Sequence, residues 1–355
     1  MLLRPPKSAG RLAMAAAIAS LVACSGKDRD LGFDPPTTAA SSASASSGAG
    51  GAGGEGGGAG GEGGAGPIEP DGSAKLTVVN GVNDYDAIEL CFLPWPGGDD
   101  VAPYPPGTAG LPFAHAAVIS PDSGAVPADT DVYLHVIAGD LEVTAGKGCA
   151  ELVAGAGGPA VVVQPLAVLP ASALAAPRSL LLVPTGCLGG PTHTDPLEKA
   201  ACGLAYSPST PNPGLVAAAM SRLVKPGRVG LQAVHAAPPM PVTDVRVTPG
   251  IPGVMPLQIA PSLSSGAIGP FPSFGSLSRS EYGLIGEMQV HTFPPNGAVA
   301  SATVPFAQAL AQGGMEEGDV LDGRGYTLVA VGALAGISAG PFWHALTFVL
   351  VQSDP

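Results

Sequence analysis

The feature that most constrains the fold of this chain is a pattern of strands that occurs twice in the same order. Four segments of the first half align with four segments of the second half. The matching pairs are 76–80 with 231–235, 88–92 with 243–247, 132–135 with 288–291, and 182–190 with 328–336. Self-similarity in the same order at similar spacings is the sequence signature of repeated domains. The sequence therefore predicts two tandem domains, at 74–190 and 228–355.

Both domains are predicted to consist of short strands. The 52 glycines and 39 prolines argue against a helical protein, because both residues interrupt helix interiors. Within 244–247 the two valines face one side and the two charged residues face the other, as in a half-buried strand. Asn-Gly at 296–297 and Asp-Gly at 322–323 are typical of tight turns. We expect a mainly β protein whose two domains are antiparallel β-sandwiches of the immunoglobulin or transthyretin type.

The segment 191–227 between the two domains has a different pattern. Asp195 is a good N-cap and is followed directly by a proline, which fits the first position of a helix. Asn212 is followed by a proline in the same way, ahead of the apolar run 215–220. The spacing predicts a helical connector with two short helices, one over 195–201 and one over 215–220.

The N-terminus has the pattern of a bacterial lipoprotein signal. Three basic residues precede an apolar run at 12–23, which is too short to span a bilayer of roughly 30 Å as a helix. The run ends in Leu-Val-Ala directly before Cys24, which is a lipobox. We expect residues 1–23 to be removed and Cys24 to carry acyl chains that anchor the protein to a membrane. The alternative is a soluble secreted protein with a chance cysteine at the cleavage site.

The residue after Cys24 bears on which membrane holds the protein. It is Ser25, whereas an aspartate there would indicate retention in the inner membrane under the enteric sorting rule. We therefore expect the outer membrane.

Residues 24–73 form the predicted tether. Serine and alanine give way to a glycine-rich stretch with two glutamates, and such a chain buries too little apolar surface to offset its ordering entropy. We expect a disordered linker with a reach of roughly 40 Å, which would hold the folded part clear of the membrane.

Four cysteines follow Cys24, namely Cys91, Cys149, Cys187 and Cys202. An even number in an exported chain indicates two disulfides, for which three connectivities exist. We favour Cys91–Cys149 and Cys187–Cys202. A cysteine-rich metal site is the competing interpretation, but the sequence has no CxxC pair and the spacings are long.

The charge of the chain limits its partners. The formal net charge is −13, and the lysines and arginines are scattered rather than clustered. This pattern gives no electrostatic footprint for nucleic acid.

The second domain resembles a known family. The segments 229–239 and 242–247 look like the opening of domain-of-unknown-function family 4397, a strand ending in His-Ala-Ser-Pro followed by a Val-Asp-Val-Tyr-Val-like strand. The segment 326–332 is similar to the closing strand of that family. Ala237 replaces the usual serine and Arg246 the usual tyrosine, and the first domain has Asn-Gly-Val-Asn in place of the His-Ala motif. The resemblance implies exported, often anchored bacterial proteins with β-sandwich-like domains and no established activity.

His235 and Asp244 are the strongest candidates for chemistry. If their strands form a hairpin, they would make a His–carboxylate pair, which could act as a general base or bind a metal. We favour a structural role instead, in which the imidazole of His235 bonds the proline-rich turn that follows it. Asn80 takes the equivalent place in the first domain, so a polar side chain that forms hydrogen bonds could be all that this position needs.

Three further histidines are weaker candidates. His193 lies beside Asp195, but a metal would need more ligands there, and we expect an exposed segment that caps a helix. His135 and His291 recur at matching places in the two domains, and we expect both to be half-buried structural residues on strands. The sequence contains no SxxK, HExxH, P-loop or EF-hand motif.

These observations favour a non-catalytic, lipid-anchored protein of the cell envelope that acts in recognition or as a structural component. We expect no cofactor and no bound metal. The expected partners are the membrane, through Cys24, and an envelope protein or surface ligand. The alternative is an envelope enzyme or metal-dependent module that uses His235, Asp244 and His193.

Overall fold

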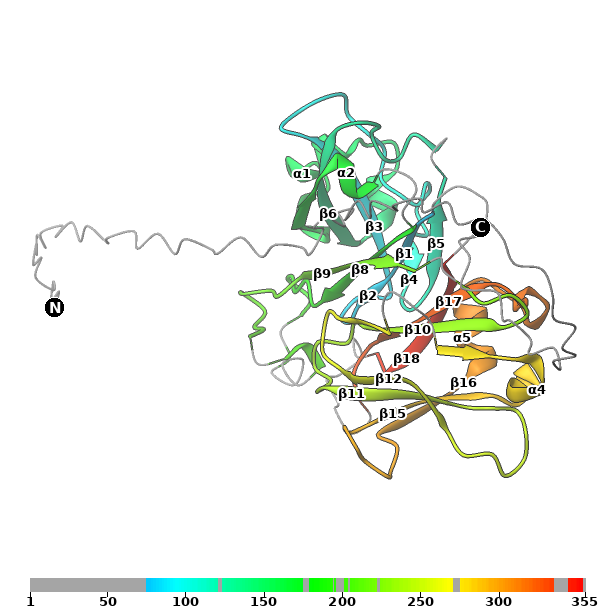
Figure 1. Cartoon of the computed structure of the whole chain (residues 1–355). Coiled ribbons are helices and arrows are strands. Elements are labelled where there is room, and N and C mark those ends of the chain that lie inside the picture. Colours follow the sequence, from blue (N-terminus) through cyan, green and yellow to red (C-terminus); the bar gives the residue numbers. More distant parts are fainter. Residues whose placement is uncertain are drawn as a thin grey trace, which may run out of the picture. The chain divides into compact units, whose positions relative to one another are not determined.

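The structure is a computed structural model that describes residues 75–120, 123–174, 179–193, 195, 201–203, 205–221, 224–270, 275–334 and 344–353 (Figure 1). All of them belong to one compact unit, Gly57–Pro355. The predicted signal peptide (1–23), Cys24 and the predicted tether (24–73) lie outside the described residues. In the part of the chain that is described, no helix is long and apolar enough to cross a membrane.

The first half of the described chain forms two sheets. One sheet has the order β2-β8-β1-β5, with β9 on the other side of β8, and the second has the order β4-β3-β6-β7. The strands of the first sheet are β1 (Leu76–Val79), β2 (Gly81–Val82), β5 (Ala116–Ile119), β8 (Ser179–Gly186) and β9 (Gly214–Met220). Those of the second are β3 (Ala87–Trp95), β4 (Leu111–Pro112), β6 (Asp131–Gly139) and β7 (Val161–Leu169).

The second half forms two further sheets. One has the order β13-β10-β17-β18, with β14 also paired to β10, and the other has the order β12-β11-β15-β16. The strands of the first are β10 (Val229–His235), β13 (Ile268–Gly269), β14 (Gly275–Leu277), β17 (Gly325–Val331) and β18 (Thr347–Gln352). Those of the second are β11 (Thr243–Thr248), β12 (Leu257–Leu263), β15 (Gln289–Phe293) and β16 (Ala302–Pro305).

Helices are short and lie between strands. The α-helices fully within the described residues are α1 (Cys149–Val153), α2 (Ala171–Leu174), α4 (Arg279–Tyr282) and α5 (Phe306–Gln312). The 3-10 turns are η2 (Leu141–Thr144), η3 (Gly158–Ala160), η4 (Ile285–Glu287) and η5 (Glu317–Asp319). The longest of the α-helices, α5, packs Phe306, Ala309 and Leu310 into the core of the second sandwich. The prediction of a mainly β protein with two sandwiches is confirmed.

The two sandwiches share one strand order. In each, the first strand pairs in parallel with a late strand, β1 with β8 and β10 with β17. In each, the late strand also pairs antiparallel with the next strand, β8 with β9 and β17 with β18. The remaining ladders are antiparallel, except for the short parallel contact of β2 with β8. The repeat in the sequence thus corresponds to a repeated topology.

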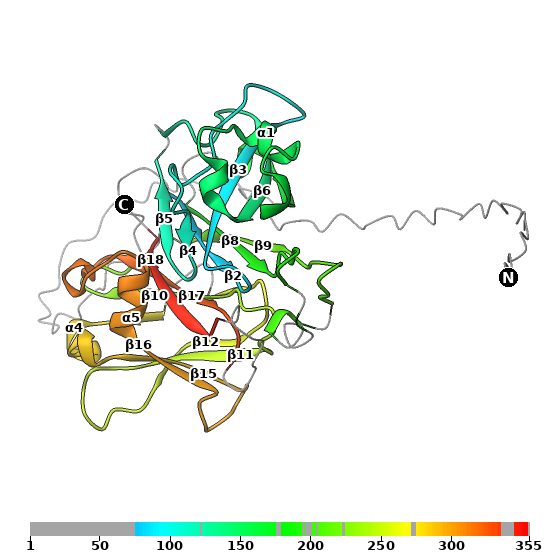
Figure 2. The same ribbon diagram turned by 180° about the vertical axis from the view of Figure 1, so that it is seen from behind.

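The four sheets lie in successive layers (Figures 1 and 2). The sheet of β10, β17 and β18 buries apolar residues on both faces. Along β17, Leu328 and Ala330 belong to the core of the second sandwich. Val329 and Val331 alternate with them and pack in a different apolar cluster, together with Leu181 and other residues of the first sandwich. Since a strand buried on both faces needs no polar side, residues 328–331 are continuously apolar.

The predicted helix over 215–220 is wrong, because this segment forms the edge strand β9. Val216, Ala218 and Met220 are buried in the cluster between the two sandwiches, with half-buried residues between them. Alanine and leucine favour helix in isolation, but this is a weak preference that tertiary contacts override. Residues 201–202 are helical, but most of the first predicted helix (196–200) lies outside the described residues, so that helix stays a prediction.

Both favoured disulfides are confirmed. Cys91 on β3 is bonded to Cys149 at the start of α1, with their Cα atoms 5.5 Å apart. Cys187, directly after β8, is bonded to Cys202, with Cα atoms 5.6 Å apart. The first bridge holds α1 against the outer face of β3, and the second closes the loop that follows the parallel strand.

Candidate functional site

The hairpin that would have paired His235 with Asp244 does not exist. His235 ends β10 and Asp244 lies on β11, and these strands belong to different sheets. Successive strands of a sandwich often cross from one sheet to the other, and the eight residues between His235 and Asp244 make that crossing here. The predicted His–carboxylate pair is therefore corrected to two separate structural residues.

His235 is fully buried and bonds the turn that follows it. Its Nε2 lies 3.1 Å from the carbonyl oxygens of both Met240 and Pro241, and its Nδ1 accepts the N–H of Ala237 at 3.4 Å. This pattern requires the neutral tautomer with the proton on Nε2. Burial lowers the pKa of His235, and the bonds to the two carbonyls only partly oppose this. The structural role that the sequence favoured for His235 is the one that the geometry supports.

Asp244 organises loops beside β11. Its carboxylate accepts the N–H of Ser262 at 2.8 Å and bonds the guanidinium of Arg246 at 3.0 Å, which in turn lies 4.1 Å from the ring centre of Phe293. Burial alone would raise the pKa of Asp244. The hydrogen bonds from Ser262, Arg246 and Asn296 outweigh it, so the pKa lies below its ordinary value. Asp244 is thus an ionised structural residue whose carboxylate already has hydrogen-bond partners.

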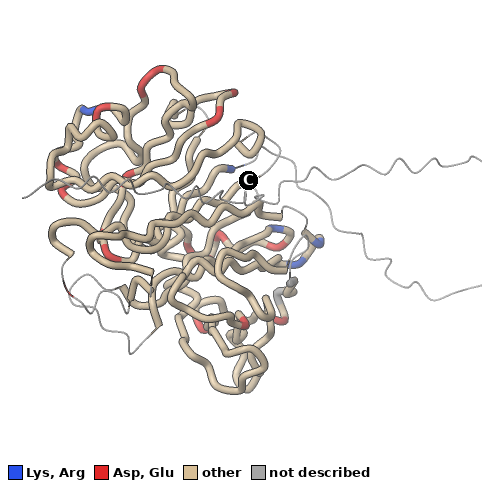
Figure 3. The backbone as a smooth tube through the Cα atoms, turned by 90° about the vertical axis from the view of Figure 1, so that its left-hand side faces the viewer, with Lys and Arg blue, Asp and Glu red and all other residues tan. Residues whose placement is uncertain are grey.

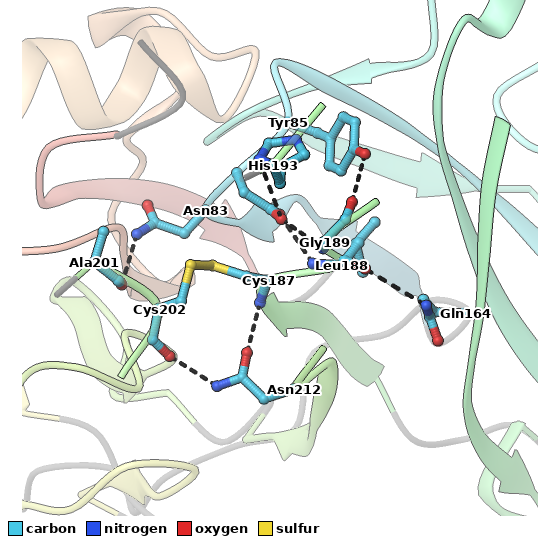
Figure 4. A network of polar contacts seen from close by, with 11 residues as sticks. Asn83, Tyr85, Gln164, Cys187, Leu188, Gly189, His193, Ala201, Cys202 and Asn212 are labelled. Carbon is cyan, nitrogen blue, oxygen red and sulfur yellow. Dashed lines mark hydrogen bonds and ion pairs between the residues drawn. A yellow bond between two sulfur atoms is a disulfide. The ribbon is translucent and has the colours of Figure 1, made fainter. Parts of the chain in front are cut away.

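His193 is fully buried, which corrects the expected exposed segment. Its Nδ1 lies 3.9 Å from the carboxylate of Asp84, and its ring centre lies 4.6 Å from that of Tyr85 (Figure 4). The backbone N–H of His193 donates to Gly190, so a tight turn folds the ring inward. The carboxylate in this contact belongs to Asp84 and not to Asp195, the neighbour that the sequence suggested.

Asp84 was not found from the sequence, yet it fixes the loop after β8. Its two carboxylate oxygens accept the backbone N–H groups of Leu188 and Gly189 at 3.0 and 2.8 Å. Tyr85 donates its hydroxyl to the carbonyl of Gly189 at 2.6 Å. The only sequence signal was a lone aspartate in a turn, which is too common to single out.

Asn212 completes this network on the other side of the disulfide. Its side chain accepts the N–H of Cys187 at 3.1 Å and donates to the carbonyl of Cys202 at 2.7 Å (Figure 4). Both half-cystines are therefore held by one amide, and the region is a structural clamp with a buried acid and a buried imidazole at its edge.

His135 and His291 lie on the equivalent strands β6 and β15 and are both nearly buried. The ring of His135 contacts the carbonyl of Tyr133 at 3.2 Å, and that of His291 lies between the hydroxyls of Thr248 and Thr303 at 2.7 and 2.9 Å. Burial lowers the pKa of both. Both are more buried than the half-buried positions that we expected, and both bond neighbouring strand residues.

A pocket in the first sandwich lies over Glu89, a residue that the sequence did not single out. Residues 88–91 of β3 are all buried. Ile88 and Leu90 face one side of the sheet, and Glu89 and Cys91, which alternate with them, face the other. There Glu89 lines a pocket of about 440 Å³ whose walls are the segments 100–103, 106–108 and 144–148. The alternating pattern of the strand predicts which face Glu89 lies on, but it does not predict the pocket above that face.

The carboxylate of Glu89 has few partners for a buried group. The residue is 1% exposed, and its Oε1 accepts the hydroxyl of Thr144 at 3.2 Å. Among the described residues, Oε2 has no hydrogen-bond partner. Burial raises the pKa of Glu89, and the bond from Thr144 opposes this only in part.

A second hollow of about 360 Å³ adjoins the first, and Thr108 lines both. It holds Asp86, Asp140 and Glu142. Figure 3 shows acidic positions along the outer loops of this sandwich. In the described part of the chain, no group of three or more His, Cys, Asp or Glu residues is arranged to hold a metal ion.

No protein-family model matches this chain, and no curated protein matches it either. Among solved structures, it is similar to the crystal structure of a "putative cell adhesion protein" from Bacteroides eggerthii, with 12% sequence identity. The similarity covers 81% of this chain and 98% of that chain, at a TM-score of 0.17. A likeness at this TM-score carries no argument about function. The resemblance to domain-of-unknown-function family 4397 stays a prediction.

Proposed function

We propose that this chain is a lipid-anchored protein of the cell envelope whose two packed β-sandwiches form a non-catalytic recognition or structural module. The main support for a non-catalytic role is the hydrogen bonding of the two strongest candidates for chemistry, His235 and Asp244. His235 and Asp244 lie on different sheets, and each already makes hydrogen bonds with neighbouring backbone, His235 to the carbonyl of Met240 and Asp244 from the N–H of Ser262. Neither is arranged to activate a nucleophile or a water molecule.

The packing of the two sandwiches supports a rigid head. Val329 and Val349 of one sandwich and Leu181 and Val183 of the other share one apolar cluster. Since relative domain motion is expected only where an interface is small or polar, a buried apolar interface favours a fixed arrangement. A fixed double sandwich presents its outer loops at constant spacing, which suits binding rather than domain closure around a substrate.

The membrane anchor is tested by replacing Cys24 with alanine in the full-length chain. We expect the wild-type protein in the membrane fraction, with the density of outer membrane in a sucrose gradient, and the C24A variant in the soluble fraction. Ser20→Ala, within the apolar run of the signal, is the control and should leave sedimentation unchanged. Sedimentation of C24A with the membranes would contradict lipid anchoring.

A further inference from the structure

The pocket over Glu89 contains a buried acid whose bonding is incomplete. Oε1 shares the hydroxyl of Thr144 with the carbonyl of Leu141, which lies closer, at 2.7 Å against 3.2 Å. A hydroxyl has one proton, so it cannot serve both acceptors fully. Oε2 has no partner among the described residues. Buried acids in proteins are almost always paired, and a buried acid that lines a pocket without a counter-ion indicates a binding site.

The charges around the pocket favour a cationic ligand. Asp100 lines the same pocket, and Asp86, Asp140 and Glu142 line the adjoining hollow. Lys147 is the one cation among the residues that line the two hollows, and its ammonium donates to the carbonyl of Val143. Clefts lined by one sign of charge raise the local concentration of ligands of the opposite sign.

The walls of the pocket are mostly aliphatic. Val101, Ala102, Pro103 and Ala145 line it, and its volume of about 440 Å³ is in the range of small-molecule sites. Such walls suit the methylene stem of a ligand better than a bare ion. The residues that line this pocket offer two carboxylates and no histidine or cysteine, which is a poor donor set for a transition metal.

The walls are held in place from two directions. The disulfide between Cys91 and Cys149 joins the strand that carries Glu89 to the start of α1. Asp100 accepts the N–H of Ala150 in α1 at 2.8 Å, so the loop on the far side of the pocket is tied to the same helix. A site whose walls are fixed before binding loses less entropy when the ligand enters.

We propose that this pocket binds a ligand with a primary ammonium group on an aliphatic stem, and that Glu89 is the counter-ion. The inference rests on the proposed recognition role and gives it a ligand class. The ammonium would supply the hydrogen bonds that Oε2 lacks, and charge-assisted bonds of this kind are the strong ones. A free amine and the side chain of a lysine carry the same chemistry.

The test is titration of the purified full-length chain with cadaverine, followed by isothermal calorimetry. We expect saturable binding, weakened about tenfold or more in E89Q, because glutamine keeps the shape of the side chain and removes the charge. The matched control is E287Q, which removes one exposed acid from the second sandwich and should bind as the wild type does. The neutral analogue 1-pentanol should show no saturable binding.

A second ligand distinguishes the source of the ammonium. Binding of Nα-acetyl-lysine methylamide that is tighter than that of cadaverine would assign the pocket to a lysine of a partner protein, and the reverse order would assign it to a free amine. Either order of affinity supports the proposal, provided that E89Q binds the ligand more weakly than the wild type does. Absence of binding of either ligand to the wild type, or equal binding to wild type and E89Q, would overturn it. Neither negative result would affect the membrane anchor, which the C24A fractionation tests separately.

Discussion

Asn80 and His235 each accept the backbone N–H two residues later and each bond a loop or strand carbonyl, at the same point of the two sandwiches. Asn80 accepts the N–H of Val82 at 3.0 Å and donates to the carbonyl of Leu111 at 2.9 Å. His235 accepts the N–H of Ala237, also two residues later, and its Nε2 contacts the carbonyl of Met240. One amide and one imidazole thus perform the same task, which is to fix the chain where the first strand of each sandwich ends.

This equivalence predicts that His235→Asn is tolerated better than His235→Ala. Alanine leaves a buried N–H and a buried carbonyl without partners, which costs about 1–3 kcal/mol for each such group. Asparagine can keep one or both bonds and should recover part of that loss. Urea unfolding of the three proteins measures the difference. Equal destabilisation by the two variants would show that the hydrogen bonds of His235 contribute little.

Acidification should destabilise the fold partly through His235. Its pKa is held below the ordinary value of 6.5 in the folded protein, so between these two values the unfolded chain binds a proton that the folded chain does not. The free energy of unfolding then falls as the pH drops below about 6.5 and is unaffected by this group above it. The slope should be shallower in H235N, and the remaining slope belongs to other histidines such as His135 and His291. An unchanged slope in H235N would argue against this assignment.

Replacement of Glu89 by glutamine should stabilise the ligand-free protein at neutral pH. The pKa of Glu89 is raised above its ordinary value of 4.5, so the folded state prefers the protonated acid. Stability from this group is complete below about pH 4.5 and is lost as the pH rises through the raised pKa. E89Q removes that loss, so its melting temperature should exceed that of the wild type at pH 7 and match it near pH 4. A lower melting temperature for E89Q at pH 7 would mean that the carboxylate is stabilised by contacts other than those described.

The apolar interface between the sandwiches should make them unfold together. Val329→Thr keeps the shape of the side chain but buries a hydroxyl between two sheets, at a cost of about 1–3 kcal/mol. The matched control is Val118→Thr on the exposed side of β5, which should change stability by less than about 0.5 kcal/mol. Calorimetry should show one transition that moves down as a whole in V329T. Two separate transitions, with only one of them shifted, would contradict the shared core.

Local patterns predicted much of this protein. The repeat of strands at 76–80 and 231–235 predicted two similar units, because alternation and turn residues are short-range signals that survive divergence. The pairing of Cys91 with Cys149 and of Cys187 with Cys202 followed from the even number of cysteines and the favoured short loop. The comparison of His235 with Asn80 indicated a structural role, since two unlike polar residues at one position share only their hydrogen bonds.

The sequence by itself therefore determined the fold class, the repeat and the disulfides. Only the tertiary structure decided that 215–220 forms strand β9, that His193 meets Asp84, and that Glu89 lies under a pocket. The reason is physical: which strand pairs with which, and which face of a sheet is covered, depends on contacts between residues far apart in the chain. No window of neighbouring residues contains that information, and a weak helix preference is overridden once a free sheet edge and an apolar neighbour are available.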